Sequence, residues 1–308
     1  MTCVLIDCDP GLDDAVALLA AFGAKELEIL VITSVAGNVK GDLSAINACI
    51  IREVADPGSR VPGCAGAPRP LLRDPVTAED FHGSTGLGNI DFPEPRLGQE
   101  QTHAVNKIIR ACKDAREDPL TLIVTGPMTN IALALAMDPE IEDGIAEIVL
   151  MGGADREGGN ITPYAEFNIY ADPHAAAAVF GSGLAIRCLS LDVTHEIRTT
   201  AARLDDVRSG KTRQSRVAGD LLEASCKLEF SANGAREAPL HDPSTVIAVT
   251  DPELFQGRRA SVEVVTDDGE QFGRTIPTFC EDGNVLWYES ADSEGVFDAL
   301  VRHLETAR

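Results

Sequence analysis

The sequence predicts an α/β fold with a mainly parallel, open sheet and helices on both faces, similar to a Rossmann fold. Short apolar runs rich in Val, Ile and Leu recur along its 308 residues, and longer segments of helical period separate them. Strands that alternate with helices form right-handed βαβ units, which build parallel sheets covered on both sides. We find no internal repeat and no dividing linker, so we expect one catalytic domain over residues 1–308.

Each element follows from its pattern of apolar residues. Continuous apolar runs are typical of strands buried on both faces, and they predict strands at residues 3–6, 27–33, 120–124, 145–151 and 185–191. Helical spacing predicts helices at residues 12–22, 42–55, 101–113, 130–137 and 173–180.

Two further segments have a distinctive composition. Residues 62–95 are dense in Gly and Pro and predict a long loop over the sheet edge. Residues 198–216 are locally basic, and we interpret them as the solvated face of a helix.

The net charge excludes two classes of partner. Lys and Arg number 26 and Asp and Glu 49, so the formal charge is −23. Nucleic-acid polymers and anionic membranes both bind through Lys and Arg, so we expect neither as a partner. A small, neutral ligand remains possible, and most of the acidic excess is expected to serve solubility.

The eight cysteines are scattered singly along the chain, without a C-x-x-C pair. This pattern indicates neither a zinc knuckle nor a redox pair. The sequence begins without a basic export signal, and no apolar stretch reaches the roughly 18–20 residues of a membrane span. We therefore expect a cytoplasmic protein.

Polar and glycine-rich turns follow four consecutive predicted strands. They are DCDPGLDD at residues 7–14, AGN at 36–38, TGPMTN at 125–130 and MGG at 151–153. In parallel α/β sheets, ligands bind beyond the carboxyl ends of the strands. The four turns therefore predict an active site at that edge of the sheet.

The first turn carries four carboxylates within eight residues: Asp7, Asp9, Asp13 and Asp14. Capping of the following helix accounts for one or two of them, such as Asp13. Four like charges at this spacing repel one another, and a bound cation relieves the repulsion. Because the turn offers oxygen ligands without His, Ca²⁺ or Mg²⁺ fits better than zinc.

Two reactions are compatible with this turn. In a phosphatase similar to the haloacid dehalogenases, Asp7 is the nucleophile and Asp9 the general acid. That reaction needs a lysine to neutralise the phosphoryl group, and no lysine follows a predicted strand convincingly. In the second reaction, a water activated by a metal ion attacks a sugar carbon.

Five motifs resemble those of the inosine-uridine-preferring nucleoside hydrolase family. They are DCDPGLDDA at residues 7–15, TGPMTN at 125–130, IVLMGG at 148–153, EFNIY at 166–170 and LHDP at 240–243. They occur in the family's order and spacing over nearly the whole chain. The resemblance implies hydrolysis of a small-molecule ribonucleoside to ribose and free base.

The resemblance also implies the metal site. In this family Ca²⁺ lies at the floor of the pocket, and the motifs assign its ligands to Asp9, Asp14, Asp242 and the carbonyl oxygen of Thr125. Asp9 is then also the general base, taking a proton from a water whose pKa the cation lowers. Nearby carboxylates stabilise the oxocarbenium-like transition state.

The family's substrate contacts match a further set of residues. The motifs assign the ribose hydroxyls to Asp13, Asn38, Asn160, Glu166 and Asn168. Met151 forms a wall of the pocket, and Phe167 stacks on the base. Turn formation is an alternative role for Asn160, and core packing is one for Met151.

Two histidines match the base side of the family's pocket. His241 resembles the acid that protonates the leaving base, although capping of the helix after Pro243 is an alternative. His82 resembles a second histidine on a loop that closes over the base. Residues 221–236 hold no Tyr, Trp or His, where family members often have an aromatic residue, so purine, pyrimidine and unselective hydrolysis remain possible.

A non-catalytic, Ca²⁺-dependent ribose-binding module is the remaining alternative. Such a module would need neither Asp9 as a base nor His241 as an acid, so their joint presence favours an enzyme. The resemblance further implies a homodimer or a homotetramer.

Overall fold

A computed structural model describes residues 1–306 except 80–82, 84 and 89. Within these residues the strands form one open sheet in the order β3-β2-β1-β4-β5-β6-β9-β7-β8. All neighbours are parallel except β7, which is antiparallel to β8 and β9. The strands are β1 (Thr2–Cys8), β2 (Leu27–Ser34), β3 (Gly63–Ala65), β4 (Leu120–Val124), β5 (Ile145–Met151), β6 (Ile186–Leu189), β7 (Phe255–Val264), β8 (Thr275–Phe279) and β9 (Val285–Ala291).

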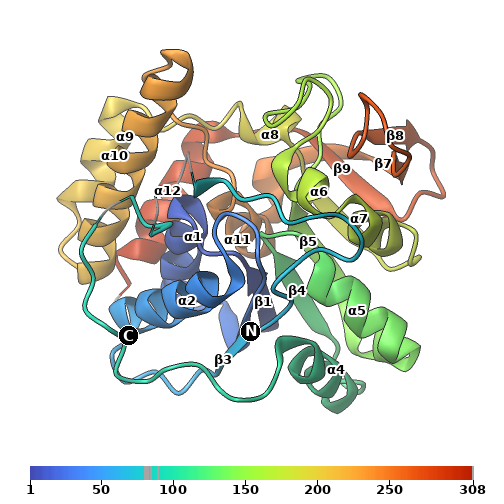
Figure 1. The fold of residues 1–308 in the computed structure, drawn as a ribbon. Coiled ribbons are helices and arrows are strands. Elements are labelled where there is room, and N and C mark those ends of the chain that lie inside the picture. Colours follow the sequence, from blue (N-terminus) through green and yellow to red (C-terminus); the bar gives the residue numbers. More distant parts are fainter. Residues whose placement is uncertain (80–82, 84, 89, 307–308) are drawn as a thin grey trace.

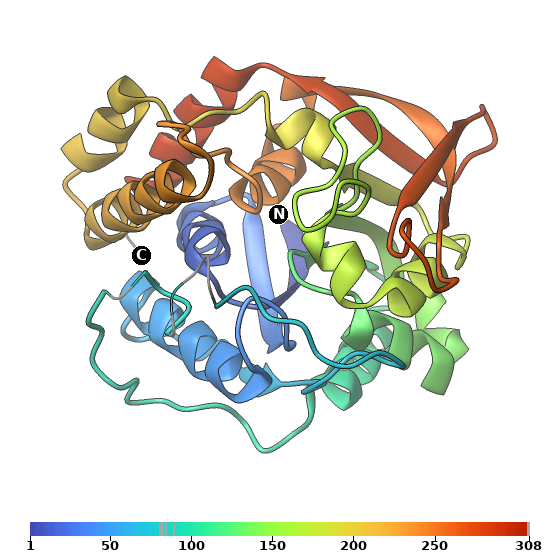
Figure 2. The same ribbon diagram turned by 45° about the horizontal axis from the view of Figure 1, so that its top comes forward.

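Helices cover both faces of the sheet, which confirms the predicted fold class (Figures 1 and 2). On one face lie α1 (Leu12–Gly23), α2 (Gly41–Ala55), α9 (Ala201–Ser209), α10 (Arg213–Asn233), α11 (Pro243–Thr250) and α12 (Ser293–Leu304). The other face carries α4 (Ala104–Asp114), α5 (Thr129–Met137) and α7 (Pro173–Phe180). Short helices α6 (Phe167–Ala171) and α8 (Leu191–Thr194) follow β5 and β6. Each face buries its own apolar core against the sheet.

The predicted elements agree with the observed ones over the first 180 residues, except near the sheet edge. The predicted loop at residues 62–95 contains β3, which pairs with β2 through three residues, too few for a periodic signal. The predicted strand at 185–191 ends at Leu189, and Leu191 begins α8. The locally basic segment at 198–216 contains α9 and the first residues of α10.

One side chain ties three strand ends together. The Asn130 amide donates to Asp7 Oδ1 at 2.8 Å and to the Ser34 carbonyl at 3.0 Å, and its oxygen accepts from the backbone N–H of Ala67 at 2.8 Å. Asp7 and Ser34 belong to β1 and β2, and Ala67 follows β3. Asn130 therefore holds this edge of the sheet in register, where the predicted site lies.

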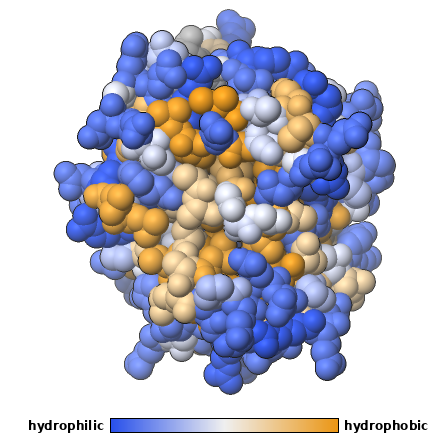
Figure 3. All heavy atoms as spheres, turned by 90° about the vertical axis from the view of Figure 1, so that its right-hand side faces the viewer, coloured by the Kyte–Doolittle hydropathy of each residue, from blue (hydrophilic) through white to orange (hydrophobic). Residues whose placement is uncertain are grey.

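Hydrophobic side chains form a band on the face where β7 and β8 lie, with hydrophilic side chains around it (Figure 3). Among the described residues, none of the helices is long and apolar enough to span a membrane.

Candidate active site

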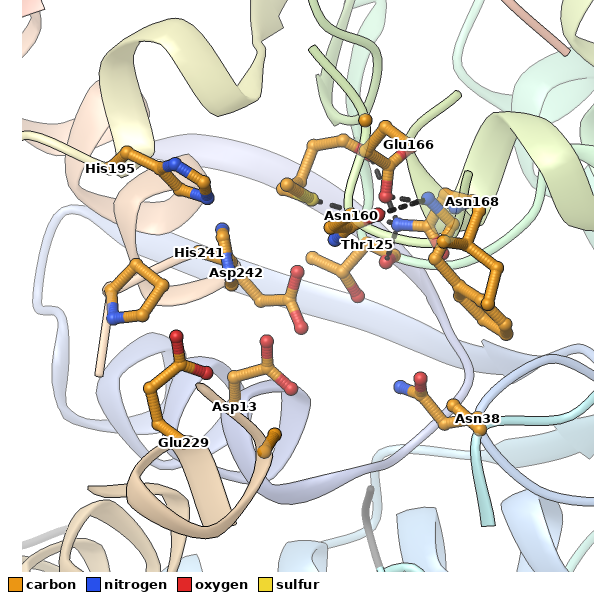
Figure 4. Close-up of a pocket in the computed structure, with 17 residues that line it drawn as sticks. Asp13, Asn38, Thr125, Asn160, Glu166, Asn168, His195, Glu229, His241 and Asp242 are labelled. Atoms are coloured by element: carbon orange, nitrogen blue, oxygen red, sulfur yellow. Dashed lines mark hydrogen bonds between the residues drawn. The ribbon is translucent and has the colours of Figure 1, made fainter. Parts of the chain in front are cut away.

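A cavity of about 510 Å³ lies at the carboxyl ends of the central strands (Figure 4). Ten of the predicted site residues line it: Asp13, Asn38, Thr125, Met151, Asn160, Glu166, Phe167, Asn168, His241 and Asp242. Asp9 and Asp14 are fully buried beside it. His82 lies outside the described residues.

Asp14 shapes the acidic turn by capping α1. Its Oδ2 accepts from the backbone N–H of Gly11 at 3.1 Å, and its Oδ1 accepts from that of Asp9 at 3.3 Å. Asp14 lies in the first turn and reaches back to the N-cap residue Gly11 as in a capping box, and the helix dipole favours a carboxylate there. The Thr125 hydroxyl and the Asn38 amide also donate to Asp14, at 2.7 and 3.0 Å. Asp14 thereby joins the turns after β1, β2 and β4.

Within the described part of the chain, hydrogen bonds reach Asp9 through one of its two carboxylate oxygens. Oδ2 accepts from the backbone N–H of Asn38 at 2.6 Å, whereas the buried Oδ1 has no hydrogen-bond partner among the described atoms. Glycines make room for this carboxylate, because a Cβ on Gly37 would lie 2.0 Å from Oδ2 and one on Gly126 would lie 2.8 Å from Oδ1. The close approach of the Asp9 carboxylate therefore explains why glycine occurs at these positions in two of the four turns.

Three carboxylates come together at the floor of the cavity. Oxygens of Asp13, Asp14 and Asp242 lie within 4.8 Å of one another. Burial raises the pKa of both Asp13 and Asp242, and the charge of Asp13 raises that of Asp242 further, as expected for carboxylates packed this closely. The buried Oδ1 of Asp13 has no hydrogen-bond partner among the described atoms. The predicted ligands Asp14 and Asp242 thus meet in one cluster, which also includes Asp13.

The electrostatics of the cluster favour a cation. Burial, followed by the charges of Asp13, Asp14 and Asp9, raises the pKa of Asp242 well above its ordinary value. Burial and the charge of Asp14 raise the pKa of Asp9 in the same way. A divalent ion would reverse both shifts and would give the unpartnered oxygens a ligand, so the residues present fit a hard cation.

Polar side chains on the opposite side of the cavity are held by the backbone. Glu166 caps α6, accepting from the N–H groups of Asn168 and Ile169 at 2.8 and 3.1 Å, and from Gly153 at 3.0 Å. Burial nevertheless raises the pKa of Glu166 to about 7. The Asn168 amide donates to the carbonyl oxygens of Thr125 and Met151 at 2.7 and 3.2 Å. These bonds fix the orientation of both side chains at the cavity wall.

Asn160 forms a turn, which is the alternative role that the sequence predicted for it. Its Oδ1 accepts from the backbone N–H of Phe167 at 2.9 Å, so it closes the loop that precedes α6. Asn160 and Phe167 both line the cavity as well.

His241 lies at the far end of the cavity from Asn38 and Asn168 (Figure 4). Its Nδ1 is 2.8 Å from the Thr194 hydroxyl, which orients the ring. His195 packs against it with ring centroids 5.7 Å apart, and His195 Nδ1 is 3.1 Å from Glu157 Oε2. Asp192 holds Glu157 in turn by accepting from its backbone N–H at 2.9 Å.

The cavity also contains His195 and Pro239, which the sequence analysis missed, and Glu229, which belongs to the segment 221–236 that the family resemblance puts on the base side. His195 follows β6, so extending the examination of strand ends to a fifth strand would have found it. Pro239 comes from the segment after α10, far from any strand end, and no such rule identifies it.

Asp7 does not face the cavity, which removes the geometric basis of a phosphatase. It is fully buried, and its Oδ1 accepts from Thr33 Oγ1 at 2.6 Å and from the Asn130 amide. Burial raises its pKa to about 6. Asp7 supports the sheet edge instead of presenting a nucleophile.

Comparisons with known proteins agree with this geometry. Residues 4–298 match the family model of inosine-uridine preferring nucleoside hydrolases. The inosine-uridine preferring nucleoside hydrolase of Crithidia fasciculata is 37% identical over 90% of this chain and 87% of that protein. The pyrimidine-specific ribonucleoside hydrolase RihA of Photobacterium profundum is 39% identical over 89% of this chain and 87% of that protein. A solved purine-preferring ribonucleoside hydrolase from Gardnerella vaginalis superposes with a TM-score of 0.91 and 30% identity, covering 99% of this chain and 98% of that one.

Proposed function

The chain belongs to the inosine-uridine preferring nucleoside hydrolase family and is a ribonucleoside hydrolase, and we propose that Ca²⁺, Asp9 and His241 carry its reaction. The observation that carries this proposal is the buried carboxylate cluster at the floor of a cavity whose far end holds an oriented histidine. Residues 1–308 act as one catalytic domain, a view that the family match over most of the chain supports.

The metal ligands are Asp9, Asp14, Asp242 and the carbonyl oxygen of Thr125. Ca²⁺ suits this set because carboxylate and carbonyl oxygens are its usual ligands, and the described cluster contains no His or Cys. The Thr125 carbonyl accepts one hydrogen bond from Asn168, and its second lone pair can bind an ion. When bound, Ca²⁺ would lower the pKa of the attacking water and hold the ribose diol.

Asp9 accepts the proton of the attacking water. Its Oδ2 is engaged by Asn38, so Oδ1 is the atom that receives this proton. The water oxygen forms a bond to C1′ of ribose as the bond from C1′ to the base nitrogen breaks. The surrounding carboxylates Asp13 and Glu166 stabilise the positive charge that develops on the sugar.

His241 donates a proton to the departing base. The Thr194 hydroxyl contacts its Nδ1, so we assign the donated proton to Nε2. A neutral base is a far better leaving group than its anion, so general acid catalysis of this kind accelerates the reaction about 10²- to 10⁴-fold. His82 remains a prediction for the same side of the base.

The ribose hydroxyls bind Asp13, Asn38, Asn160, Glu166 and Asn168, with Met151 and Phe167 as walls. The fixed orientation of Glu166 and Asn168 supports this assignment, because backbone hydrogen bonds already hold both side chains at the cavity wall before a sugar binds. We also propose a cytoplasmic homodimer or homotetramer, and the apolar band in Figure 3 supports self-association.

The test is release of reducing sugar from inosine, uridine, guanosine and cytidine, with Ca²⁺ and with a chelator. We expect turnover with Ca²⁺ and its loss in chelator, with Mg²⁺ restoring less activity than Ca²⁺. Ribose release that is equally fast in chelator would overturn the Ca²⁺ assignment.

A further inference from the structure

One carboxylate in the cavity belongs to neither the acidic cluster nor the ribose side. Four carboxylates line the described cavity: Asp13, Glu166, Glu229 and Asp242. Asp13 and Asp242 meet at the floor, and Glu166 is bound by three backbone N–H groups. Glu229 comes from α10 and lines the cavity separately from these two arrangements.

Glu229 occupies the same end of the cavity as the two histidines. In Figure 4 its carboxylate points into the cavity on the side of His195 and His241, with Asn38 and Asn168 on the other side. It projects from α10, and Ala232, almost one helical turn further on, lines the cavity too. One face of α10 therefore forms the wall at this end. If the ribose binds the amides, as our proposed function requires, Glu229 faces the base.

A carboxylate at this position discriminates between bases by their hydrogen-bonding groups. An ionised carboxylate only accepts hydrogen bonds, so it attracts an amino group and repels a carbonyl oxygen. Cytosine carries an amine where uracil, of nearly the same shape, carries a carbonyl. Guanine likewise has an amine that hypoxanthine lacks. The difference between paired and unpaired groups is what selects substrates in such a pocket.

We propose that Glu229 is a specificity-determining residue that favours ribonucleosides whose base carries an exocyclic amine. It accepts a hydrogen bond from that amine, so cytidine is hydrolysed in preference to uridine and guanosine in preference to inosine. A hydrogen bond to a charged group corresponds to about tenfold or more in kcat/KM.

The experiment measures kcat/KM for cytidine and uridine with the wild type, E229Q and the control E237Q. Glu237 is exposed on the segment after α10 and does not line the described cavity, and its substitution removes the same charge. We expect a wild-type preference for cytidine of about tenfold, a loss of most of it in E229Q, and its retention in E237Q. The glutamine amide can donate to the uracil carbonyl, so uridine should improve in E229Q.

An activated aryl riboside, whose leaving group has no amine, separates the possible failures. Its hydrolysis by E229Q reports any general loss of activity, and the ratio of kcat/KM for cytidine to that for uridine within each variant is independent of such a loss. A cytidine preference near one in the wild type, or one that E229Q leaves unchanged, would overturn the role of Glu229 while the hydrolase function stands. No hydrolysis of the aryl riboside or any nucleoside by the wild type with Ca²⁺ would overturn both.

Discussion

Replacing Asp9 by Asn tests the proposed role of Asp9 as the catalytic base with little change of shape. The asparagine oxygen can keep the hydrogen bond from the Asn38 N–H, which places its NH₂ group where Oδ1 now lies without a described partner. That group cannot accept a proton from water. We expect kcat to fall by about 10²- to 10⁴-fold, which corresponds to about 2.7–5.4 kcal/mol of transition-state stabilisation.

The assay is single-substrate turnover of inosine at saturating Ca²⁺, with D267N as the control because Asp267 is exposed in a turn. Thermal unfolding in chelator gives an independent readout. Burial and neighbouring charges raise the pKa of Asp9, so its charged form destabilises the metal-free fold at pH 7. D9N removes this charge and should therefore unfold in chelator at the same temperature as the wild type or at a higher one. Turnover within a few-fold of the wild type would refute the base assignment, and a lower unfolding temperature in chelator would refute the argument from repulsion.

Three further outcomes are expected. H241A should lose about 10²-fold in kcat/KM on inosine but change little on an activated aryl riboside; equal losses on both would show that His241 is not the acid. Ca²⁺ at about 100 times its Kd should stabilise the fold by about 2.7 kcal/mol, seen as a rise of about 5 °C in Tm that D242N abolishes. His303 is buried, and burial lowers its pKa from 6.5, so the unfolded chain takes up a proton first as the pH falls. The free energy of unfolding should therefore decline as the pH drops below about 6.5, and H303Q should flatten that decline in urea titrations at pH 5 and pH 8.

The sheet edge beyond β6 shows where prediction from local pattern stops. Strands β7, β8 and β9 lie at the antiparallel edge, and several of their side chains are exposed, so they lack the continuous apolar runs that identified β4 and β5. Strand β3 is too short to show any periodicity. Its pairing with β2 depends on the chain after α2 returning to the sheet edge, which is a tertiary contact.

The sequence by itself determined the fold class, the edge of the sheet that carries the site and the residue types found there. It could do so because buried parallel strands have a continuous apolar pattern, and because the turns after them must meet at one edge. Only the tertiary structure decided which carboxylates share the cluster, since Asp13 and Asp242 are 229 positions apart in sequence. It also decided that Asp7 supports the sheet, it brought His195 into the cavity, and it decided that Glu229 is the residue of segment 221–236 whose carboxylate enters the cavity. Their positions depend on how α8 and α10 pack, which no local pattern encodes.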